Sequence, residues 1–390
     1  MRKAIIVVGA NYGDEGKGLA AYAAAPAGEK CLNVMINGGP QRGHTVDLPD
    51  GRRHVFHHFG SAALKGAVSC ADEDYMVNPA LLREEYVELR KDFALTPRLL
   101  VHEKCRVTTP WDMMAGQISE ESRGRKRHGS CGCGIFETRK RYEQAPRSLG
   151  FGKLAELTGE QLDVYCAWIA EEYIPQRLQE MGVEADAKWR GILEDPGIRR
   201  AFREDLRFMK EHTEVYRDWA KTAAEWPYLV FEAGQGLALD EMNRDDFPYL
   251  TPSRTGSEIS GKRIAAIPGE TKTAVLYVTR SYITRHGAGP LPGECPKEEI
   301  NPDMTDLTNV PNPHQETLRY AGMDTEALRK RVDRDWEATR ETLPGLRRML
   351  LITHMNETDG KLAGGGSMAD LTQSFDRVLF SDRPDGVTTA

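Results

Sequence analysis

The sequence has no long hydrophobic run, few cysteines and no excess of basic residues. Its apolar stretches, such as residues 4–8 and 349–352, are far shorter than the roughly 18–20 residues of a membrane-spanning helix. The apolar stretch after Arg2 and Lys3 is also too short for the hydrophobic part of a secretory signal. We therefore expect no membrane partner and a cytoplasmic location.

The charge balance and the cysteines exclude further classes of protein. The net charge is −7, which argues against a nucleic-acid partner. The seven cysteines are an odd number, show no paired spacing and are spread thinly over 390 residues, so we expect a reducing compartment. Hydrophobic residues make up 40% of the chain, which is enough for a packed core and excludes general disorder.

Strand and helix patterns alternate along the chain. Apolar runs predict buried strands at residues 4–8, 31–36, 99–101, 228–231, 274–278 and 349–352. Helical spacing covers residues 18–25, 80–89, 158–181, 198–226 and 325–341, and Thr158 with Gln161 has the spacing of a capping box. This order predicts the α/β class, with a mostly parallel central sheet, flanking helices and helical insertions. Because no linker-like change of composition appears, we expect one domain over residues 1–390.

A glycine-rich segment, residues 9–18, joins the first predicted strand to the first predicted helix. Its backbone N–H groups and the helix N-terminus can surround a phosphate, and Lys17 adds a cation. A Walker A loop needs glycine at position 11 and a hydroxyl residue at position 18, where this chain has Asn11 and Gly18. Asp14 could supply the Mg²⁺ ligand that the hydroxyl would otherwise provide. The segment predicts a P-loop-like phosphate site; the alternative is a tight turn that binds nothing.

Six segments in order resemble those of the adenylosuccinate synthetase family. They are residues 13–18, 38–45, 77–79, 231–236, 248–251 and 284–290. Enzymes of this family join aspartate to the 6-position of a purine nucleotide, driven by hydrolysis of a nucleoside triphosphate. Together the segments span residues 13–290, so the resemblance implies a C–N ligase of this kind, dependent on Mg²⁺ and usually dimeric.

The resemblance also implies a role for individual residues. It implies Asp14 as the base at purine N1 and His44 as the group that stabilises charge between O6 and the γ-phosphate. Residues matching the triphosphate contacts are Gly13, Glu15, Gly16, Lys17, Gly18, Gly43, Thr45, Thr353, His354 and Asn356, with Asp14 and Gly43 at the metal. Residues matching the substrate-nucleotide contacts are Asn37, Gln41, Ser130, Cys131, Gln235, Leu239, Thr251 and Gly287.

The nucleotide-phosphate loop departs from the family pattern. Residues 129–134 read Gly-Ser-Cys-Gly-Cys-Gly where the family usually has Gly-Thr-Thr-Gly-Arg-Gly. Ser130 keeps a hydroxyl and Cys131 a weaker donor, so we expect the phosphate site to survive. A Cys-x-Cys metal site is the alternative, but no second ligand pair has suitable spacing. Of the arginines that could be lent across a dimer interface, the nearest are Arg139, Arg141 and Arg147.

The aspartate loop departs further. Common members carry several arginines there, which suit carboxylates because a planar guanidinium bonds them bidentately. Within residues 306–320 only one arginine remains, and the expected aspartate ligands are Thr308, Asn309, Gln315 and Arg319. This pattern resembles a phage branch of the family, the 2-aminoadenylosuccinate synthetases, which act on dGMP. A member of that branch would work in the host cytoplasm.

The segment expected to bind the donor base also favours the phage branch, whereas one residue of the phosphate loop favours the common enzymes. The common enzymes read guanine with an aspartate where this chain has Asn356, whose amide suits adenine and therefore ATP or dATP. Glu357 or Asp359 remain alternatives if the register differs. Asp14 is retained, whereas the best-known phage enzymes have a small residue there. We therefore expect a ligase acting on dGMP, with IMP as the alternative substrate and a phosphate-binding switch protein as the alternative class.

Overall fold

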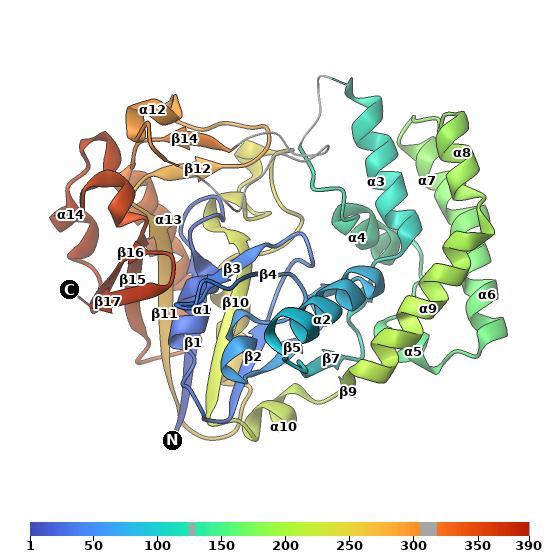
Figure 1. Ribbon diagram of the computed structural model, residues 1–390, viewed down its shortest axis with the longest axis horizontal. Helices are drawn as coiled ribbons and strands as arrows, with labels where there is room; N and C mark the ends of the chain where they lie inside the picture. The colour runs from blue at the N-terminus through green and yellow to red at the C-terminus, as the bar shows by residue number, and fades with distance from the viewer. Residues whose placement is uncertain (125–128, 305–317, 390) are drawn as a thin grey trace.

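A twisted ten-stranded sheet runs through the centre of the molecule (Figure 1). The computed structural model describes residues 1–124, 129–304 and 318–389. The strand order is β17-β16-β15-β11-β1-β10-β2-β5-β7-β9, and every neighbouring pair is parallel except β16 with β17. The strands are β1 (Arg2–Gly9), β2 (Cys31–Met35), β5 (Val68–Ala71), β7 (Leu99–His102), β9 (Glu214–Tyr216), β10 (Tyr228–Gly236), β11 (Thr271–Arg280), β15 (Arg347–Thr353), β16 (Arg377–Arg383) and β17 (Gly386–Thr389). The expected α/β class with a mostly parallel sheet is confirmed.

The register of the central strands brings their carboxyl ends together. At the end of β1, Gly9 lies opposite Gly236 of β10 and Val278 of β11. Ile6, Val7 and Val8 are buried completely, as a strand covered on both faces requires. In open parallel sheets ligands bind beyond the carboxyl ends of the strands. The loops after β1, β2, β10, β11 and β15 therefore meet where a site is expected.

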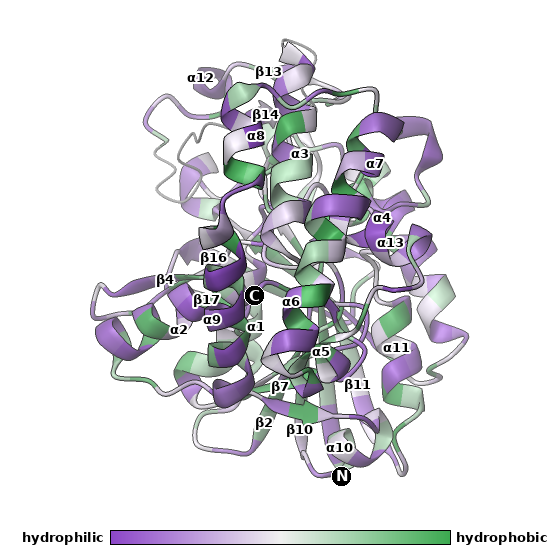
Figure 2. Cartoon of the chain, turned by 90° about the vertical axis from the view of Figure 1, so that its right-hand side faces the viewer, coloured by the Kyte–Doolittle hydropathy of each residue, from purple (hydrophilic) through white to green (hydrophobic). Residues whose placement is uncertain are grey.

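Helices cover the sheet and form a second core beside it. The helices are α1 (Lys17–Ala24), α2 (Pro79–Phe93), α3 (Pro110–Ser122), α4 (Ile135–Gln144), α5 (Phe151–Glu156), α6 (Gly159–Ala167), α7 (Ile174–Glu180), α8 (Ala187–Leu193), α9 (Pro196–His212), α10 (Trp219–Ala224), α11 (Glu258–Ala265), α12 (Lys297–Ile300), α13 (Thr325–Arg340) and α14 (Met368–Thr372). Helices α3 to α9 gather on the right of Figure 1 around their own apolar cluster. Apolar and polar stretches alternate along α3 and α6 in Figure 2, as amphipathic helices require.

Short elements complete the chain. The remaining strands are β3 (His44–Asp47), β4 (Arg53–Phe56), β6 (Met76–Val77), β8 (Arg106–Val107), β12 (Ile283–Arg285), β13 (Glu294–Cys295) and β14 (Arg319–Ala321). Single turns of 3₁₀ helix lie at Ser61–Lys65, Leu237–Leu239, Arg244–Asp246, Met355–Thr358 and Ala363–Gly365. No helix in the described part of the chain is long and apolar enough to cross a membrane.

Two of the predicted helices need comment. The expectation of one helix over residues 198–226 is wrong, because α9 ends at His212 and β9 then pairs with β7 before α10 begins. The Asp218 side chain accepts a hydrogen bond from the Lys221 N–H, so α10 has a start of its own. The expectation over residues 158–181 holds, although a π-helical turn at Trp168–Tyr173 joins α6 to α7. The Thr158–Gln161 capping box is present with both hydrogen bonds.

Candidate functional site

The phosphate loop between β1 and α1 depends on glycine at several positions. Gly13 and Gly16 have φ angles of 118° and 90°, a conformation that L side chains rarely adopt. Gly18 is required for another reason, since a Cβ atom there would collide with the carbonyl oxygen of Thr45. The second glycine loop, which leads into β3, therefore packs directly on the start of α1.

Two charged side chains of this loop are buried within it. Lys17 is 2% exposed and its Nζ donates to the Gly13 carbonyl, while a Glu15 carboxylate oxygen accepts from the Asn11 N–H. Burial lowers the pKa of Lys17 and raises the pKa of Glu15 to about 7. The other Glu15 oxygen is buried and has no hydrogen-bond partner among the described residues. Both charged groups of the loop are thus held by contacts within the loop.

Asp14 lies at the edge of the loop, with its carboxylate partly exposed. Its Oδ2 is 3.4 Å from Nε2 of His286, which belongs to the segment after β12. The Arg280 side chain donates to the Asp14 carbonyl and so fixes the backbone beneath this carboxylate. The residue proposed as base therefore faces the segment that contains Gly287, a proposed nucleotide contact. His286 was not predicted as a site residue, although it stands where the family pattern has valine.

His44 is held by a buried glutamate. Its Nδ1 lies 2.6 Å from Oε1 of Glu232 on β10, and both side chains are buried. An ionised carboxylate can only accept, so Nδ1 is the donor and the Nε2 position faces away from Glu232. Burial, opposed by this hydrogen bond, lowers the pKa of His44 to about 4. His44 is therefore neutral at neutral pH and has one ring nitrogen left for a ligand.

Glu232 has more partners than His44. It accepts 3.0 Å hydrogen bonds from the Asn33 amide and the Ser61 N–H, and Nη1 of Arg42 lies 3.8 Å away. Burial alone would raise the pKa of this carboxyl group, but the charge of Arg42 and the hydrogen bond from His44 outweigh it and lower the pKa to about 2. Neither Glu232 nor Arg42 was expected at the site, although both lie within family segments, residues 231–236 and 38–45.

The ion pair between Glu232 and Arg42 should stabilise the fold. We expect Glu232→Gln to lower the free energy of unfolding at pH 7 by about 3 kcal/mol, because it leaves Arg42 buried without its counter-charge. The folded-state pKa of Glu232 is depressed from the ordinary 4.5 to about 2, so its contribution is present above pH 4.5 and lost as the pH falls toward 2. Urea unfolding at a series of pH values should show that the difference in free energy of unfolding between wild type and variant shrinks as the pH falls from 4.5 toward 2. A constant difference between the two proteins would contradict this account.

Several proposed nucleotide contacts converge at the end of β10. The Asn37 amide donates to the carbonyls of Gly234 (3.2 Å) and Arg254 (2.7 Å), so the loop after β2 is bound to the loop after β10. The Thr251 N–H donates to the Leu239 carbonyl at 2.9 Å. Asn37 is thereby joined to Gly234 and Arg254, and Thr251 to Leu239.

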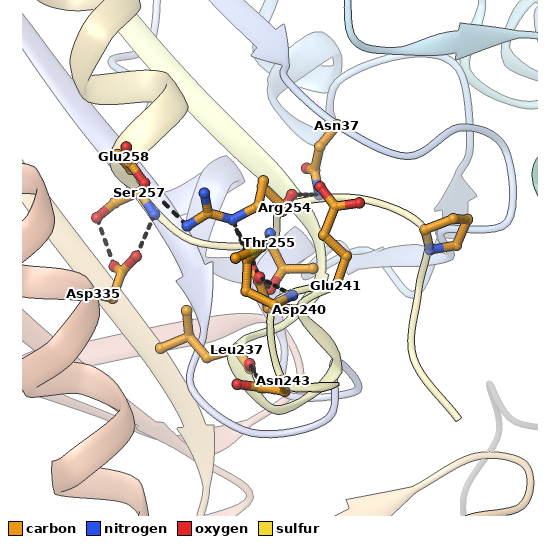
Figure 3. Close-up of polar contacts among 12 residues, drawn as sticks. Asn37, Leu237, Asp240, Glu241, Asn243, Arg254, Thr255, Ser257, Glu258 and Asp335 are labelled. Atoms are coloured by element: carbon orange, nitrogen blue, oxygen red, sulfur yellow. Dashed lines mark hydrogen bonds and ion pairs between the residues drawn. The ribbon is translucent and has the colours of Figure 1, made fainter. Parts of the chain in front are cut away.

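Figure 3 shows polar contacts among Asp240, Arg254 and Thr255, in the segment that follows β10. The buried Asp240 carboxylate accepts from Nε of Arg254 at 3.2 Å and from the Thr255 N–H at 2.7 Å, and Arg254 also bonds Glu258 at 3.0 Å. The turn at Arg254 and Thr255 is therefore held by Asp240 and by Glu258. These bracing residues were not expected from the sequence.

Other nucleotide candidates lie in strained or close-packed backbone. Gln235 has a φ of 64°, unusual for a residue other than glycine, and such strain clusters at functional sites. Gln41 folds back on its own loop, since a Cβ on Gly38 would lie 2.8 Å from its Nε2. A Cβ on Gly129 would lie 2.8 Å from the Cα of Gly287, so the loop that begins Gly129-Ser130-Cys131 starts beside that segment.

No group of three potential metal ligands occurs within residues 1–124, 129–304 and 318–389.

The proposed donor pocket adjoins the phosphate loop. The Thr353 hydroxyl donates to the Glu15 carbonyl at 2.9 Å and lies 2.8 Å from Nδ1 of His354, which has a φ of 58°. Asn356 is exposed, whereas the Glu357 carboxylate already accepts from the Tyr282 hydroxyl. The site thus leaves the amide of Asn356 open to a ligand.

Of the four proposed aspartate ligands, one lies within the described residues. Thr308, Asn309 and Gln315 lie outside the described residues. Arg319 on β14 is paired with Glu294 through a 2.8 Å bond from Nε, and its Nη1 donates to the Gly287 carbonyl at 3.1 Å. Arg319 therefore lies against the segment that faces Asp14.

Comparison with known proteins assigns the family. The family model described as adenylosuccinate synthetase matches residues 6–334. The chain belongs to the adenylosuccinate synthetase family. A curated adenylosuccinate synthetase from Alkalilimnicola ehrlichii is 29% identical over 315 residues, which cover 76% of this chain and 66% of that protein. The chain thus spans just under two thirds of the length of curated relatives of this kind.

Two solved structures share the fold of this adenylosuccinate synthetase family member. One is a fully ligated adenylosuccinate synthetase from Plasmodium falciparum, with a TM-score of 0.67, 17% identity, and coverage of 90% of this chain and 77% of that one. The other is a succinoaminodeoxyadenylate synthetase from cyanophage S-2L, bound to dGMP and to dATP as energy donor. It has a TM-score of 0.62, 16% identity, and coverage of 100% and 95%.

Of the arginines considered for a shared site in this family member, one is unsuited to that role. Arg141 is buried completely and makes two 2.8 Å bonds to Asp112, so it cannot extend to a second subunit. Arg139 is partly exposed and pairs with Glu143. Arg147 stacks over the Trp168 ring, with 5.2 Å between guanidinium and ring centroid. The latter two remain the candidates.

Proposed function

We propose that this chain is a ligase that joins L-aspartate to C6 of dGMP, with ATP or dATP as phosphate donor. The observation that carries the reaction class is the packing of the two glycine loops, which brings Lys17 and the Glu232-bound His44 close together. A phosphate-binding switch would need the first loop alone. The second loop, with a neutral histidine fixed by a buried carboxylate, fits a reaction that develops charge on a transferring phosphoryl group.

The proposed reaction has two steps. Asp14 removes the N1 proton, negative charge moves to O6, and O6 attacks the γ-phosphorus while the bond to the β-phosphate oxygen breaks. His44 and Lys17 stabilise the charge on the oxygens of the transferring group. The aspartate amine then attacks C6, its proton is lost to solvent, and phosphate leaves with the C6–O6 bond. The product is N6-succino-2-amino-2'-deoxyadenylate, a precursor of diaminopurine for DNA.

The residues also fit a magnesium ion. Mg²⁺ prefers oxygen ligands and is usually held by one or two protein groups together with the substrate phosphates. The partly exposed Asp14 carboxylate and the Gly43 carbonyl are suitable donors beside the phosphate loop. When bound there, the ion would neutralise charge on the triphosphate.

The choice of dGMP rests on two departures from the common family pattern. The aspartate loop has lost all its arginines but one, and Asn356 stands where the common enzymes have aspartate. The solved cyanophage S-2L enzyme is bound to dGMP and dATP. IMP remains the second candidate, because Asp14 is retained and the curated relatives carry the name adenylosuccinate synthetase. We propose a homodimer as the working form, as the resemblance implies.

A substrate matrix tests the proposal. Purified protein, Mg²⁺ and aspartate are mixed with dGMP, GMP or IMP, each with ATP, dATP or GTP, and products are identified by chromatography and mass spectrometry. Succinylated product from dGMP with an adenine donor supports the proposal. Product from IMP alone would replace it with adenylosuccinate synthesis, and triphosphate binding without any product would favour the switch protein.

The donor base provides a separate prediction. We expect Asn356→Asp to shift the ratio of kcat/KM for ATP over GTP by about 10-fold or more toward GTP, because a carboxylate accepts from guanine N1–H and its amino group. Glu357→Gln is the matched control, since that carboxylate is already bonded to Tyr282. If the control shifts the ratio and Asn356→Asp does not, Glu357 is the residue that reads the base.

A further inference from the structure

Asn11 connects the phosphate loop to three other parts of the fold. Its side chain is 1% exposed and occupies the position where a Walker A loop has glycine. The amide donates to the Thr279 hydroxyl on β11 at 3.0 Å and accepts from Arg331 on α13. Its carbonyl accepts from the Ala238 N–H at 2.8 Å, next to Leu239. Replacing the usual glycine with Asn11 thus creates a buried junction.

Arg331 is the most distant member of this junction in the sequence. Its Nε donates to the Ala10 carbonyl at 3.2 Å, and its Nη2 donates to Oδ1 of Asn11. Burial lowers the pKa of Arg331, against the opposing charges of Glu15 and Asp324. Arg331 is partly buried and donates hydrogen bonds to a backbone carbonyl and to a side-chain amide of the phosphate loop. It is therefore placed to hold that loop.

One helical turn later, the same face of α13 holds the nucleotide side of the site. Asp335 accepts from the Ser257 N–H at 2.8 Å, from the Ser257 hydroxyl at 2.6 Å and from the Tyr277 hydroxyl at 2.8 Å. Figure 3 shows this contact beside the turn of Arg254 and Thr255. A Cβ on Gly256 would collide with the Asp335 carboxylate, so the turn fits closely against α13. Positions four apart on a helix share a face.

We propose that α13 sets the distance between the two phosphate-binding regions, with Arg331 and Asp335 as its positioning residues. Arg331 fixes the loop that holds the donor triphosphate, and Asp335 fixes the turn that follows Thr251. Transfer in line between two bound nucleotides depends on their separation, and a displacement of about 1 Å can cost about 100-fold in rate. The kinetic part of this inference rests on the proposed function.

The test compares Arg331→Met with Lys330→Met on the same helix. Lys330 is exposed and pairs only with Glu326 among the described residues, so its substitution should change nothing. We expect Arg331→Met to lower kcat about 10- to 100-fold while each nucleotide KM changes less than about threefold. Arg331→Lys should recover part of the rate, because an ammonium group can still reach the Ala10 carbonyl. Amide hydrogen exchange over residues 10–16 should accelerate in Arg331→Met alone.

Other outcomes separate the two proposals. Unchanged kcat and unchanged exchange in Arg331→Met would overturn the positioning role, as would a loss confined to KM. If wild-type protein forms no product from any nucleotide, the proposed function fails, and hydrogen exchange alone decides the role of α13. If Arg331→Met does not fold, Asp335→Asn replaces it. Faster exchange over residues 251–257 in that variant supports the inference, and wild-type exchange there overturns it.

Discussion

Asp14→Asn should reduce kcat about 10²- to 10⁴-fold, the range that a positioned general base contributes. The substitution keeps the size of the side chain but removes its ability to take the N1 proton. Its only ion pair among the described residues is with His286 at 3.4 Å, and both side chains are partly exposed. Pairs of this kind contribute about 0–1 kcal/mol, so the variant should fold normally. Steady-state assays with dGMP and with IMP give the loss for each substrate.

An isotope experiment assigns the loss to a step. In donor nucleotide labelled with ¹⁸O at the β,γ-bridge, reversible transfer to O6 scrambles the label into the β-phosphate. Asp14→Asn should suppress scrambling, because without N1 deprotonation no charge reaches O6. Asp50→Asn, an exposed aspartate on the β3–β4 hairpin, is the control. Scrambling at the wild-type rate in Asp14→Asn would show that another residue is the base.

Features that depend on residues close together in the sequence were predicted correctly, and features that depend on residues far apart in the sequence were not. The first strand, the glycine loop and the helix after it are local features, so the continuous apolar run and turn chemistry predicted them correctly. The break between α9 and α10 was missed, because β9 forms only through pairing with β7. Local helical spacing cannot register a partner that lies over a hundred residues earlier. Tertiary pairing outweighed helix propensity there.

The candidate site shows the same division. Glycine spacing and the family resemblance named Asp14, Lys17 and His44, whereas the groups that hold them were not predicted. Glu232 lies 188 residues from His44, and Arg331 lies 320 residues from Asn11. Such partners become visible only when parallel strands bring their carboxyl ends to one edge. The sequence therefore names the candidate reactive groups, and the fold shows which groups fix their position and charge.

The second large effect is expected at His44. We expect His44→Asn to lower kcat about 10²- to 10³-fold, the usual loss when one donor to a developing oxyanion is removed. Glu232 would keep its bonds from Ser61 and Asn33, so the ion pair with Arg42 should persist and the fold should remain intact. His212→Asn, at the end of α9 and remote from the loops, is the control.

The pKa of His44 explains why this residue should act on the transition state more than on binding. Burial keeps the imidazole neutral, with a pKa of about 4 and its proton on the nitrogen that faces Glu232. The negative triphosphate and the charge that develops on O6 raise that pKa, so the ring can take a second proton from solvent at Nε2 and donate it as a hydrogen bond to the developing charge. An interaction made only in the transition state lowers kcat and kcat/KM together when it is lost. A rise in the nucleotide KM with unchanged kcat in His44→Asn would instead make His44 a binding residue.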